Sequence, residues 1–249
     1  MLIERKAFPI LGTLLITAQV AGAQSRPLNL RVDVQPTAAF LAGNVTRVSY
    51  VVANDTQSTD RLFEFAVQSP VPVWRLELPT PRSQYHGVVQ EGGENVASWG
   101  WLEDMPRPGE RSPVLAYEAI GLPGIVLYRA LRYFGVRDAR PATDEPEKIW
   151  FDSAGLEYAV GKTVGVVSLP IDLRPAALAA RLRRLVDEAC NLSWIDRRGT
   201  CRTLRANARP SVKAIRAFHR ELVTKRGREV SEAAFALLAP NAEFLLTKM

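Results

Sequence analysis

The sequence contains few of the residues from which metal sites and disulfide-based scaffolds are built. Its 249 residues include two histidines and two cysteines, and neither H-x-x-x-H nor C-x-x-C spacing occurs. Zinc sites draw their ligands from such pairs, so the sequence predicts no metal and no cofactor. Two cysteines are also too few for the disulfide framework of a small secreted scaffold.

Long hydrophobic runs are equally scarce. The main uncharged apolar stretch, residues 7–23, follows a basic start and ends in Ala21-Gly22-Ala23, an A-x-A cleavage motif. This layout is typical of a secretory signal peptide, whereas Pro9 and Gly12 make the stretch a poor membrane anchor. We therefore expect residues 1–23 to be removed near Ala23, leaving a secreted or periplasmic chain without a membrane span. A retained, uncleaved anchor is the alternative.

Signatures of nucleotide binding and hydrolysis are incomplete. Gly161-Lys162-Thr163 resembles the end of a P-loop, but the first glycine of that motif would fall at position 156, which is Leu156. No G-x-S-x-G elbow accompanies the histidines. The sequence thus predicts no enzyme. A hydrolase is the alternative, and it would need convergent polar groups around His86 or the acidic loop 91–104.

What the chain does contain is enough apolar sequence for packed domains. Hydrophobic residues make up 47% of it and charged residues 23%, which excludes a disordered chain. The length fits one large domain or two ordinary ones.

The first part of the mature chain, residues 24–170, is predicted to be a β-sandwich domain. Apolar and polar residues alternate in short runs, which is the pattern of strands with one buried face. Glycine and proline clusters such as Gly121-Leu122-Pro123-Gly124 separate these runs and are expected to be turns. Residues 131–170 are less clear: Ile149-Trp150-Phe151 and 164–169 are extra strands of the sandwich or part of a linker. The expected strands are residues 28–35, 48–52, 63–67, 74–78, 96–101 and 114–119.

Residues 171–249 change to helical patterning. Leu178, Leu182, Leu185 and Ala189 form an apolar stripe on one face of a helix for which Asp172 is the expected N-cap. Three further helices are predicted. Thr200 is the expected cap of the second, and the third covers Val212–Leu222 and stops at Gly227. Ser231 is the expected cap of the fourth, in which Pro240 causes a kink or a restart. The fold class is therefore α+β with two domains: an N-terminal antiparallel immunoglobulin-like sandwich and a small C-terminal antiparallel helical bundle.

Charge divides at the same boundary. Residues 171–249 hold 16 Lys and Arg against 8 Asp and Glu, and the remainder of the chain holds 16 against 18. The basic half either binds a polyanion or is an ordinary solvated helix surface. Nucleic acid is not expected, because arginines and aromatic residues do not alternate along it.

Three tryptophans and the two cysteines are the candidate site residues. Trp74, Trp99 and Trp101 fall on expected strands, and Trp99 and Trp101 share one face. An exposed face would be a stacking platform for a sugar ligand, whereas a buried one would be sandwich core. Cys190 ends the first predicted helix and Cys201 begins the second, so a disulfide between them is expected across the helical hairpin.

Two stretches resemble known families. Ser98-Trp99-Gly100-Trp101, Gly121-Leu122-Pro123-Gly124-Ile125 and Gly161-Lys162-Thr163-Val164-Gly165 resemble uncharacterised secreted bacterial proteins with an immunoglobulin-like sandwich. The C-terminal residues resemble the helical FIMAH module that closes many secreted bacterial proteins, with departures at Ser193, where glycine is expected, and at Pro240. The resemblance implies an extracellular accessory module and attaches no catalytic residue to it. The residues that carry the FIMAH resemblance are Trp194, Ile195, Gly199, Leu204, Ala217, Phe218, Gly227, Ala234–Leu238, Asn241 and Ala242.

These features predict an exported, non-enzymatic binding or interaction module of the cell envelope or extracellular space. Its partner would be an extracellular protein or glycan. Two alternatives stay open: a secreted hydrolase acting on glycan or peptide, and a structural accessory partner of another secreted protein. An exposed, contiguous apolar patch would favour the last of these.

Overall fold

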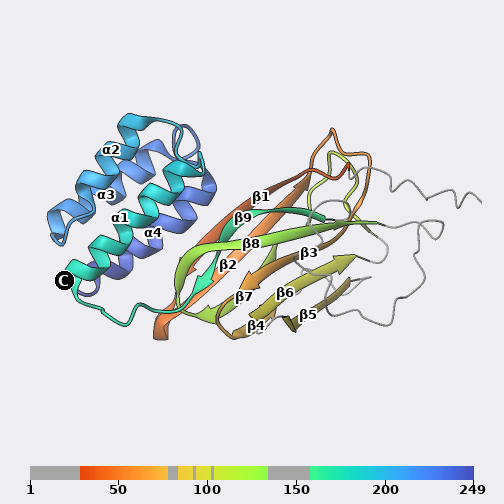
Figure 1. The fold of residues 1–249 in the computed structure, drawn as a ribbon, viewed down its shortest axis with the longest axis horizontal. Helices are drawn as coiled ribbons and strands as arrows, with labels where there is room; N and C mark the ends of the chain where they lie inside the picture. The colour runs from red at the N-terminus through yellow and green to blue at the C-terminus, as the bar shows by residue number, and fades with distance from the viewer. Residues whose placement is uncertain (1–28, 78–83, 92–93, 102–103, 134–157) are drawn as a thin grey trace, which may run out of the picture.

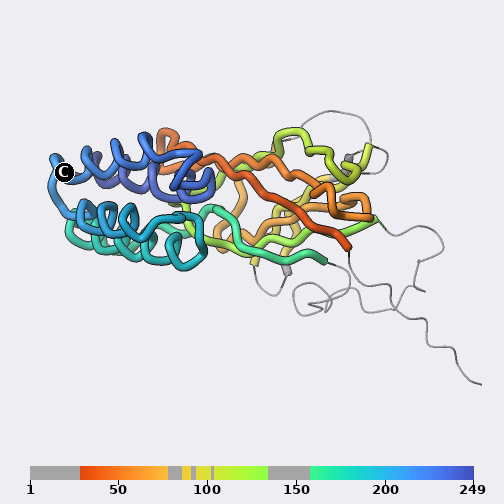
Figure 2. Tube along the Cα trace, turned by 90° about the horizontal axis from the view of Figure 1, so that it is seen from above, coloured from red at the N-terminus to blue at the C-terminus, as the bar shows by residue number. Residues whose placement is uncertain are grey.

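A computed structural model of the chain describes residues 29–77, 84–91, 94–101, 104–133 and 158–249. The expected signal peptide, residues 1–23, and the strand expected at Ile149-Trp150-Phe151 lie outside these residues. The described residues form two antiparallel β-sheets and four α-helices. Figures 1 and 2 show the helices together at one end of the molecule and the sheets at the other.

The two sheets pack face to face as a sandwich. Sheet A has the strand order β1-β2-β7-β4, and sheet B has the order β5-β6-β3-β8-β9. A single 3-10 turn, Ala42–Asn44, joins β1 to β2. The strands are β1 (Val32–Phe40), β2 (Val45–Asn54), β3 (Leu62–Ser69), β4 (Val73–Glu77), β5 (Gln84–Glu91), β6 (Glu94–Trp101), β7 (Leu115–Ile120), β8 (Leu122–Arg132) and β9 (Tyr158–Val167).

Aromatic side chains fill the space between the sheets. Tyr50 from β2 lies edge-on to both Phe65 and Trp99, with ring centroids 5.5 and 6.2 Å apart. Phe65 and Trp99, on neighbouring strands of sheet B, stack at 6.3 Å. All three side chains are buried, and in β2 the buried residues alternate with less buried ones, as the period of two predicts.

Strand β8 corrects the expectation of a turn at Gly121-Leu122-Pro123-Gly124. Only Gly121 lies between β7 and β8, and the residues that follow it pair with β9 from Leu122 onward. A Cβ on Gly124 would stand 2.5 Å from a methyl of Val167, so glycine is needed here for close approach of two strands rather than for a turn. Strand β5 is also absent from the strands that the alternation of apolar and polar residues predicts.

The four helices are α1 (Pro175–Asn191), α2 (Arg198–Asn207), α3 (Val212–Lys225) and α4 (Glu232–Leu246). Ser231 caps α4 as predicted, because its side chain accepts a hydrogen bond from the amide of Ala234 at 3.2 Å. The predicted N-cap of α1 is wrong: Arg174 holds that position, and Asp172 instead accepts a hydrogen bond from the Arg174 amide at 2.9 Å. Helix α4 runs through Pro240 without a restart.

Helix α2 begins before its expected cap. Thr200 lies inside the helix, and its hydroxyl donates to Glu229 instead of capping the first turn. The predicted disulfide is confirmed: Cys190 and Cys201 are bonded, with their Cα atoms 6.3 Å apart. It joins the last turn of α1 to the first turn of α2.

The helices and sheets meet through α4. Phe244 of α4 packs edge-on against Phe40 at the end of β1, with ring centroids 5.3 Å apart. The buried side-chain amide of Asn241 donates to the carbonyl of Pro123 at 3.0 Å and to that of Leu237, one turn back in α4. Because Pro123 belongs to β8, this contact fixes α4 against sheet B.

Two buried tyrosines join β9 to sheet A, and we expect them to make stability sensitive to alkali. The hydroxyl of Tyr50 donates to the carbonyl of Val164 at 2.7 Å, and the hydroxyl of Tyr117 accepts from the amide of Val166 at 2.8 Å. Burial raises the pKa of both tyrosines above the ordinary value of 10.0. The unfolded chain loses these protons first as pH rises, so the stabilising effect is complete below pH ~10 and is lost above it.

We expect the free energy of unfolding in urea to fall between pH 10 and 11.5, by up to about 1.4 kcal/mol per pH unit for each tyrosine. Tyr50→Phe should be less stable at pH 8 and should show a shallower loss above pH 10. The same slope in both proteins would contradict this.

Candidate functional site

An apolar groove opens at the end of the sandwich that faces the helices. It encloses about 630 Å³. Its walls come from the turn between β3 and β4, from the end of β7 and from the chain that leaves β9. The lining residues are Val71, Pro72, Val73, Trp74, Ile120, Ser168 and Leu169.

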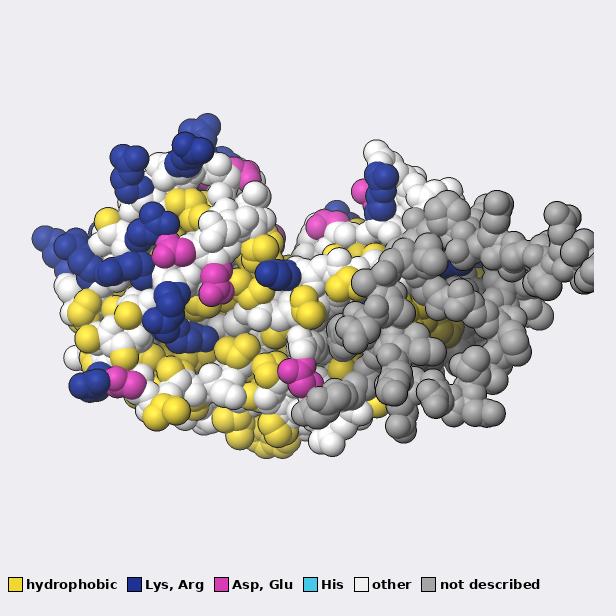
Figure 3. Space-filling view, in the orientation of Figure 1, with side chains coloured by type: hydrophobic (Ala, Val, Ile, Leu, Met, Phe, Trp, Pro, Cys, Tyr) yellow, Lys and Arg dark blue, Asp and Glu magenta, His cyan; other side chains and the backbone are white. Residues whose placement is uncertain are grey.

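Two large apolar side chains of this groove are open to solvent. Trp74 is 70% exposed and Ile120 is 56% exposed. Ile171 and Leu173, in the segment that connects β9 to α1, are also exposed. Figure 3 shows hydrophobic side chains at the surface along the lower side of the molecule, where the helices meet the sheets. Large apolar side chains that gather on a surface are typical of an interaction site.

The groove lies beside an edge strand. Strand β4 pairs with β7 and is the last strand of sheet A, and no described strand pairs with its other side. Trp74 is the second residue of β4. The backbone edge and the groove are therefore neighbouring features of one surface.

The other two candidate tryptophans lie in the core. Trp99 and Trp101 are each 1% exposed, so neither ring offers a surface on which a ligand could stack. The indole nitrogen of Trp99 donates to the carbonyl of Glu77 in β4 at 3.2 Å. Of the three tryptophans singled out by sequence, the structure thus leaves Trp74 alone facing solvent.

The residues considered for catalysis are His86 and the acidic loop 91–104, of which residues 92–93 and 102–103 lie outside the described part of the chain. His86 is an exposed residue of β5, and Asp104 is exposed in the segment before β7. Gly161-Lys162-Thr163 lies within β9, not in a loop that leads into a helix, so it cannot wrap a phosphate. Within the part of the chain that the structure describes, no group of three His, Cys, Asp or Glu side chains could hold a metal ion.

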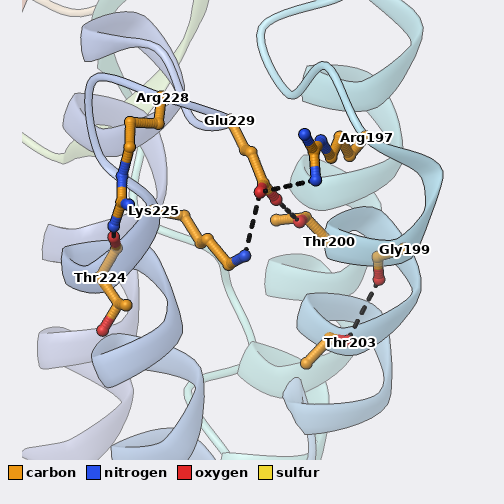
Figure 4. A network of polar contacts seen from close by, with 8 residues as sticks. All are labelled: Arg197, Gly199, Thr200, Thr203, Thr224, Lys225, Arg228 and Glu229. Carbon is orange, nitrogen blue, oxygen red and sulfur yellow. Dashed lines mark hydrogen bonds and ion pairs between the residues drawn. The ribbon is translucent and has the colours of Figure 1, made fainter.

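The Glu229 carboxylate contacts three residues of the helical region. It accepts from Thr200 and from Lys225, the latter at 3.0 Å, and pairs with Arg197 at 3.4 Å (Figure 4). The Thr200 hydroxyl and then the Lys225 ammonium lower the pKa of this carboxyl group. Glu229 therefore joins the start of α2 to the segment between α3 and α4, and its bonds suit a structural role better than proton transfer.

The helical region carries a dense cationic surface. Residues 197–220 contain eight Lys and Arg and neither Asp nor Glu. Most of these side chains are exposed along α2 and α3, and Figure 3 shows Lys and Arg gathered over this end of the molecule. One of these cations, Arg205, pairs with Asp187 of α1: the Nε of Arg205 lies 2.6 Å from a carboxylate oxygen of Asp187.

Comparisons with known proteins give a fold-level likeness at most. No protein-family model and no curated protein matches the chain. An uncharacterised Nocardia farcinica protein with an immunoglobulin-like fold is 14% identical, with a TM-score of 0.33, over 54% of this chain and 97% of its own. A GH20 exo-β-N-acetylglucosaminidase from Vibrio harveyi is 10% identical, with a TM-score of 0.27, over 57% of this chain and 18% of its own. These scores are too low to carry an argument about function.

None of the described helices combines the length and the apolar character needed to cross a bilayer.

Sequence reasoning found Trp74 but missed the rest of the groove. Ile120 and Leu169 come from β7 and from the segment after β9, which are far apart in sequence and meet only in the folded chain. Ile171 and Leu173 do carry a local signal: they are apolar residues in the segment just before α1, outside its apolar stripe.

Proposed function

We propose that this chain is a non-enzymatic interaction module that works outside the cytoplasm and holds another polypeptide in the apolar groove at Trp74. The Cys190–Cys201 disulfide supports an oxidising compartment, because such bonds are rare in the reducing cytoplasm. N-terminal sequencing of the exported protein should then find its first residue at or near Gln24.

One observation carries this proposal: a largely exposed tryptophan beside an apolar groove. An indole ring left 70% exposed gains little for the folded chain alone. Tryptophan is, however, among the residues that contribute most to protein interfaces, since it buries a large area with few rotatable bonds.

The chemistry of the groove favours a polypeptide over a glycan. Among its described lining residues, Ser168 and the indole N–H of Trp74 are the polar side-chain groups, whereas sugar hydroxyl groups need several hydrogen-bond partners. The neighbouring edge of β4 offers main-chain donors and acceptors to an extended segment. A strand that adds to β4 would place alternate apolar side chains in the groove, which is the usual arrangement of β-augmentation.

We further propose that residues 24–170 and 171–249 are two units, with the second similar to a FIMAH module. The contacts of Asn241 and Phe244 with the sandwich support a fixed arrangement of the two. In that arrangement the connecting segment, with exposed Ile171, borders the groove, so both units shape one binding surface.

Site-specific photo-crosslinking in the producing cell tests the proposal. A photoreactive amino acid replaces Ile120 in the groove and, as a matched control, Val88 on β5, which is 42% exposed. We expect one discrete adduct from position 120 and none from position 88. Mass spectrometry should map the adduct to a partner segment with alternating apolar residues, and Trp74→Ala should abolish it.

Three outcomes would contradict the proposal. They are the absence of an adduct, the same adduct from position 88, or an adduct between two copies of this chain.

A further inference from the structure

A second cavity lies between the end of α1 and the first turns of α2, away from the apolar groove. It encloses about 510 Å³. The disulfide between Cys190 and Cys201 forms part of its wall and holds the two helices at this point. In contrast to the groove at Trp74, its lining is mainly polar.

Three arginines of α2 line this cavity. Arg198, Arg202 and Arg205 are spaced four and three residues apart, so their side chains share one face of the helix. Arg205 pairs with Asp187, while Arg198 and Arg202 form no ion pair with any residue that the structure describes. Two guanidinium groups at one cavity are therefore available to an anion, which they can bind through paired hydrogen bonds.

Neutral and acidic groups complete the lining. Asn191 is the last residue of α1, and Ser193 and Asp196 come from the segment between α1 and α2. Ser193 has a φ of 58°, in the left-handed region that favours glycine. A residue other than glycine adopts this conformation at a cost, and Ser193 is one of the residues that line the cavity.

We infer that this cavity binds an acidic sugar of a polyanionic glycan. The guanidinium groups of Arg198 and Arg202 would hold the carboxylate or sulfate of the sugar. Asn191 and Ser193 would donate to and accept from its hydroxyl groups. The carboxylate of Asp196 can accept from a sugar hydroxyl group, which a bare polyphosphate lacks, so the mixed lining favours a glycan.

Other polyanions fit the surface less well. Binding at a membrane interface needs apolar side chains beside the cationic ones, and the exposed positions of α2 hold arginine, threonine, glycine and alanine. Single-stranded nucleic acid needs aromatic rings for base stacking. Within residues 158–249, the large apolar side chains that are exposed carry no aromatic ring, and Trp194, next to the cavity, is half-buried against the helical core.

Titration of the full chain with labelled glycans tests the inference, with the disulfide intact. The probes are an oligogalacturonate, a heparin oligosaccharide, neutral dextran, phosphatidylglycerol vesicles and single-stranded DNA. We expect saturable binding of at least one acidic glycan and none of dextran. Arg198→Ala/Arg202→Ala should weaken glycan binding about tenfold or more, since hydrogen bonds to charged groups are lost.

A matched double variant separates this cavity from general charge attraction. Arg216→Ala/Arg220→Ala removes the same charge from exposed positions of α3 and should weaken glycan binding no more than about threefold, as expected for screened surface charges. Asn191→Ala, which leaves the charge unchanged, should weaken glycan binding several-fold without affecting DNA. Circular dichroism melting checks that each variant folds.

Three results would overturn the inference. They are equal losses in the two double variants, tighter binding to vesicles or DNA than to either glycan, and no binding to either glycan. None of these results concerns the groove at Trp74. The inference can therefore be wrong while the proposed function is right, and the reverse.

Discussion

Replacing Trp99 by alanine should lower the free energy of unfolding by about 3–5 kcal/mol, whereas Trp74→Ala should change it by no more than about 0.5 kcal/mol. The two residues differ in burial: Trp99 is 1% exposed and Trp74 is 70% exposed. Removing the Trp99 ring would leave a cavity between Phe65 and Tyr50, against which it packs. Removing the Trp74 ring takes away few contacts.

Urea unfolding of the two variants beside the unchanged chain measures both effects. The pair also serves the crosslinking experiment, because a stable Trp74→Ala protein that loses its adduct has lost a binding contact and not its fold. A loss of several kcal/mol in Trp74→Ala would assign that ring to the core and would contradict the proposed function.

The sequence pattern was informative wherever one face of an element is buried. Val48, Tyr50 and Val52 alternate with less buried residues and are buried in β2, so the period of two identified this strand. The apolar stripe of α1 likewise identified the helix, and four helices follow the sheets as expected. The disulfide between Cys190 and Cys201 was predicted from the expected hairpin of the first two helices, an oxidising compartment and the lack of other cysteines.

The pattern failed where burial does not alternate. Strand β5 is an edge strand whose neighbouring Val88 and Val89 are both exposed, so its sequence lacks a period of two. Strand β8 begins with Leu122-Pro123-Gly124, and proline and glycine are usual in turns; here Gly124 is needed because β9 approaches too closely for a larger residue. In α4 most positions are buried, since α1, α3 and the sandwich surround it, so this helix was predicted from its Ser231 cap and its apolar residues without a one-sided stripe.

The candidate sites depend on tertiary contacts even more than the fold does. The groove at Trp74 joins segments separated by about a hundred residues, and no local pattern connects them. The second cavity is more local, because α2 and the segment before it supply most of its polar lining. An excess of cations over residues 171–249 was visible in the sequence, but their arrangement around a disulfide was not.

The largest effect of a single polar substitution is expected at Glu64. Its carboxylate lies 3.1 Å from the guanidinium of Arg129, and the side chains are 10% and 1% exposed. The Arg129 guanidinium also lies 5.5 Å from the centre of the Tyr158 ring, so it is enclosed between β3 and β9. A charge in such a place is costly unless a partner balances it.

Glu64→Gln should therefore lower the free energy of unfolding in urea by about 3–5 kcal/mol, the usual cost of breaking a buried ion pair from one side. Glu64→Leu/Arg129→Met removes both charges and should recover most of that loss, because the desolvation cost disappears with the pair. As a surface control, Glu232→Gln breaks the exposed pair with Arg226 and should cost no more than about 1 kcal/mol. If the double variant were less stable than Glu64→Gln, the pair would be stabilising the sheet in its own right, and the desolvation argument would be wrong.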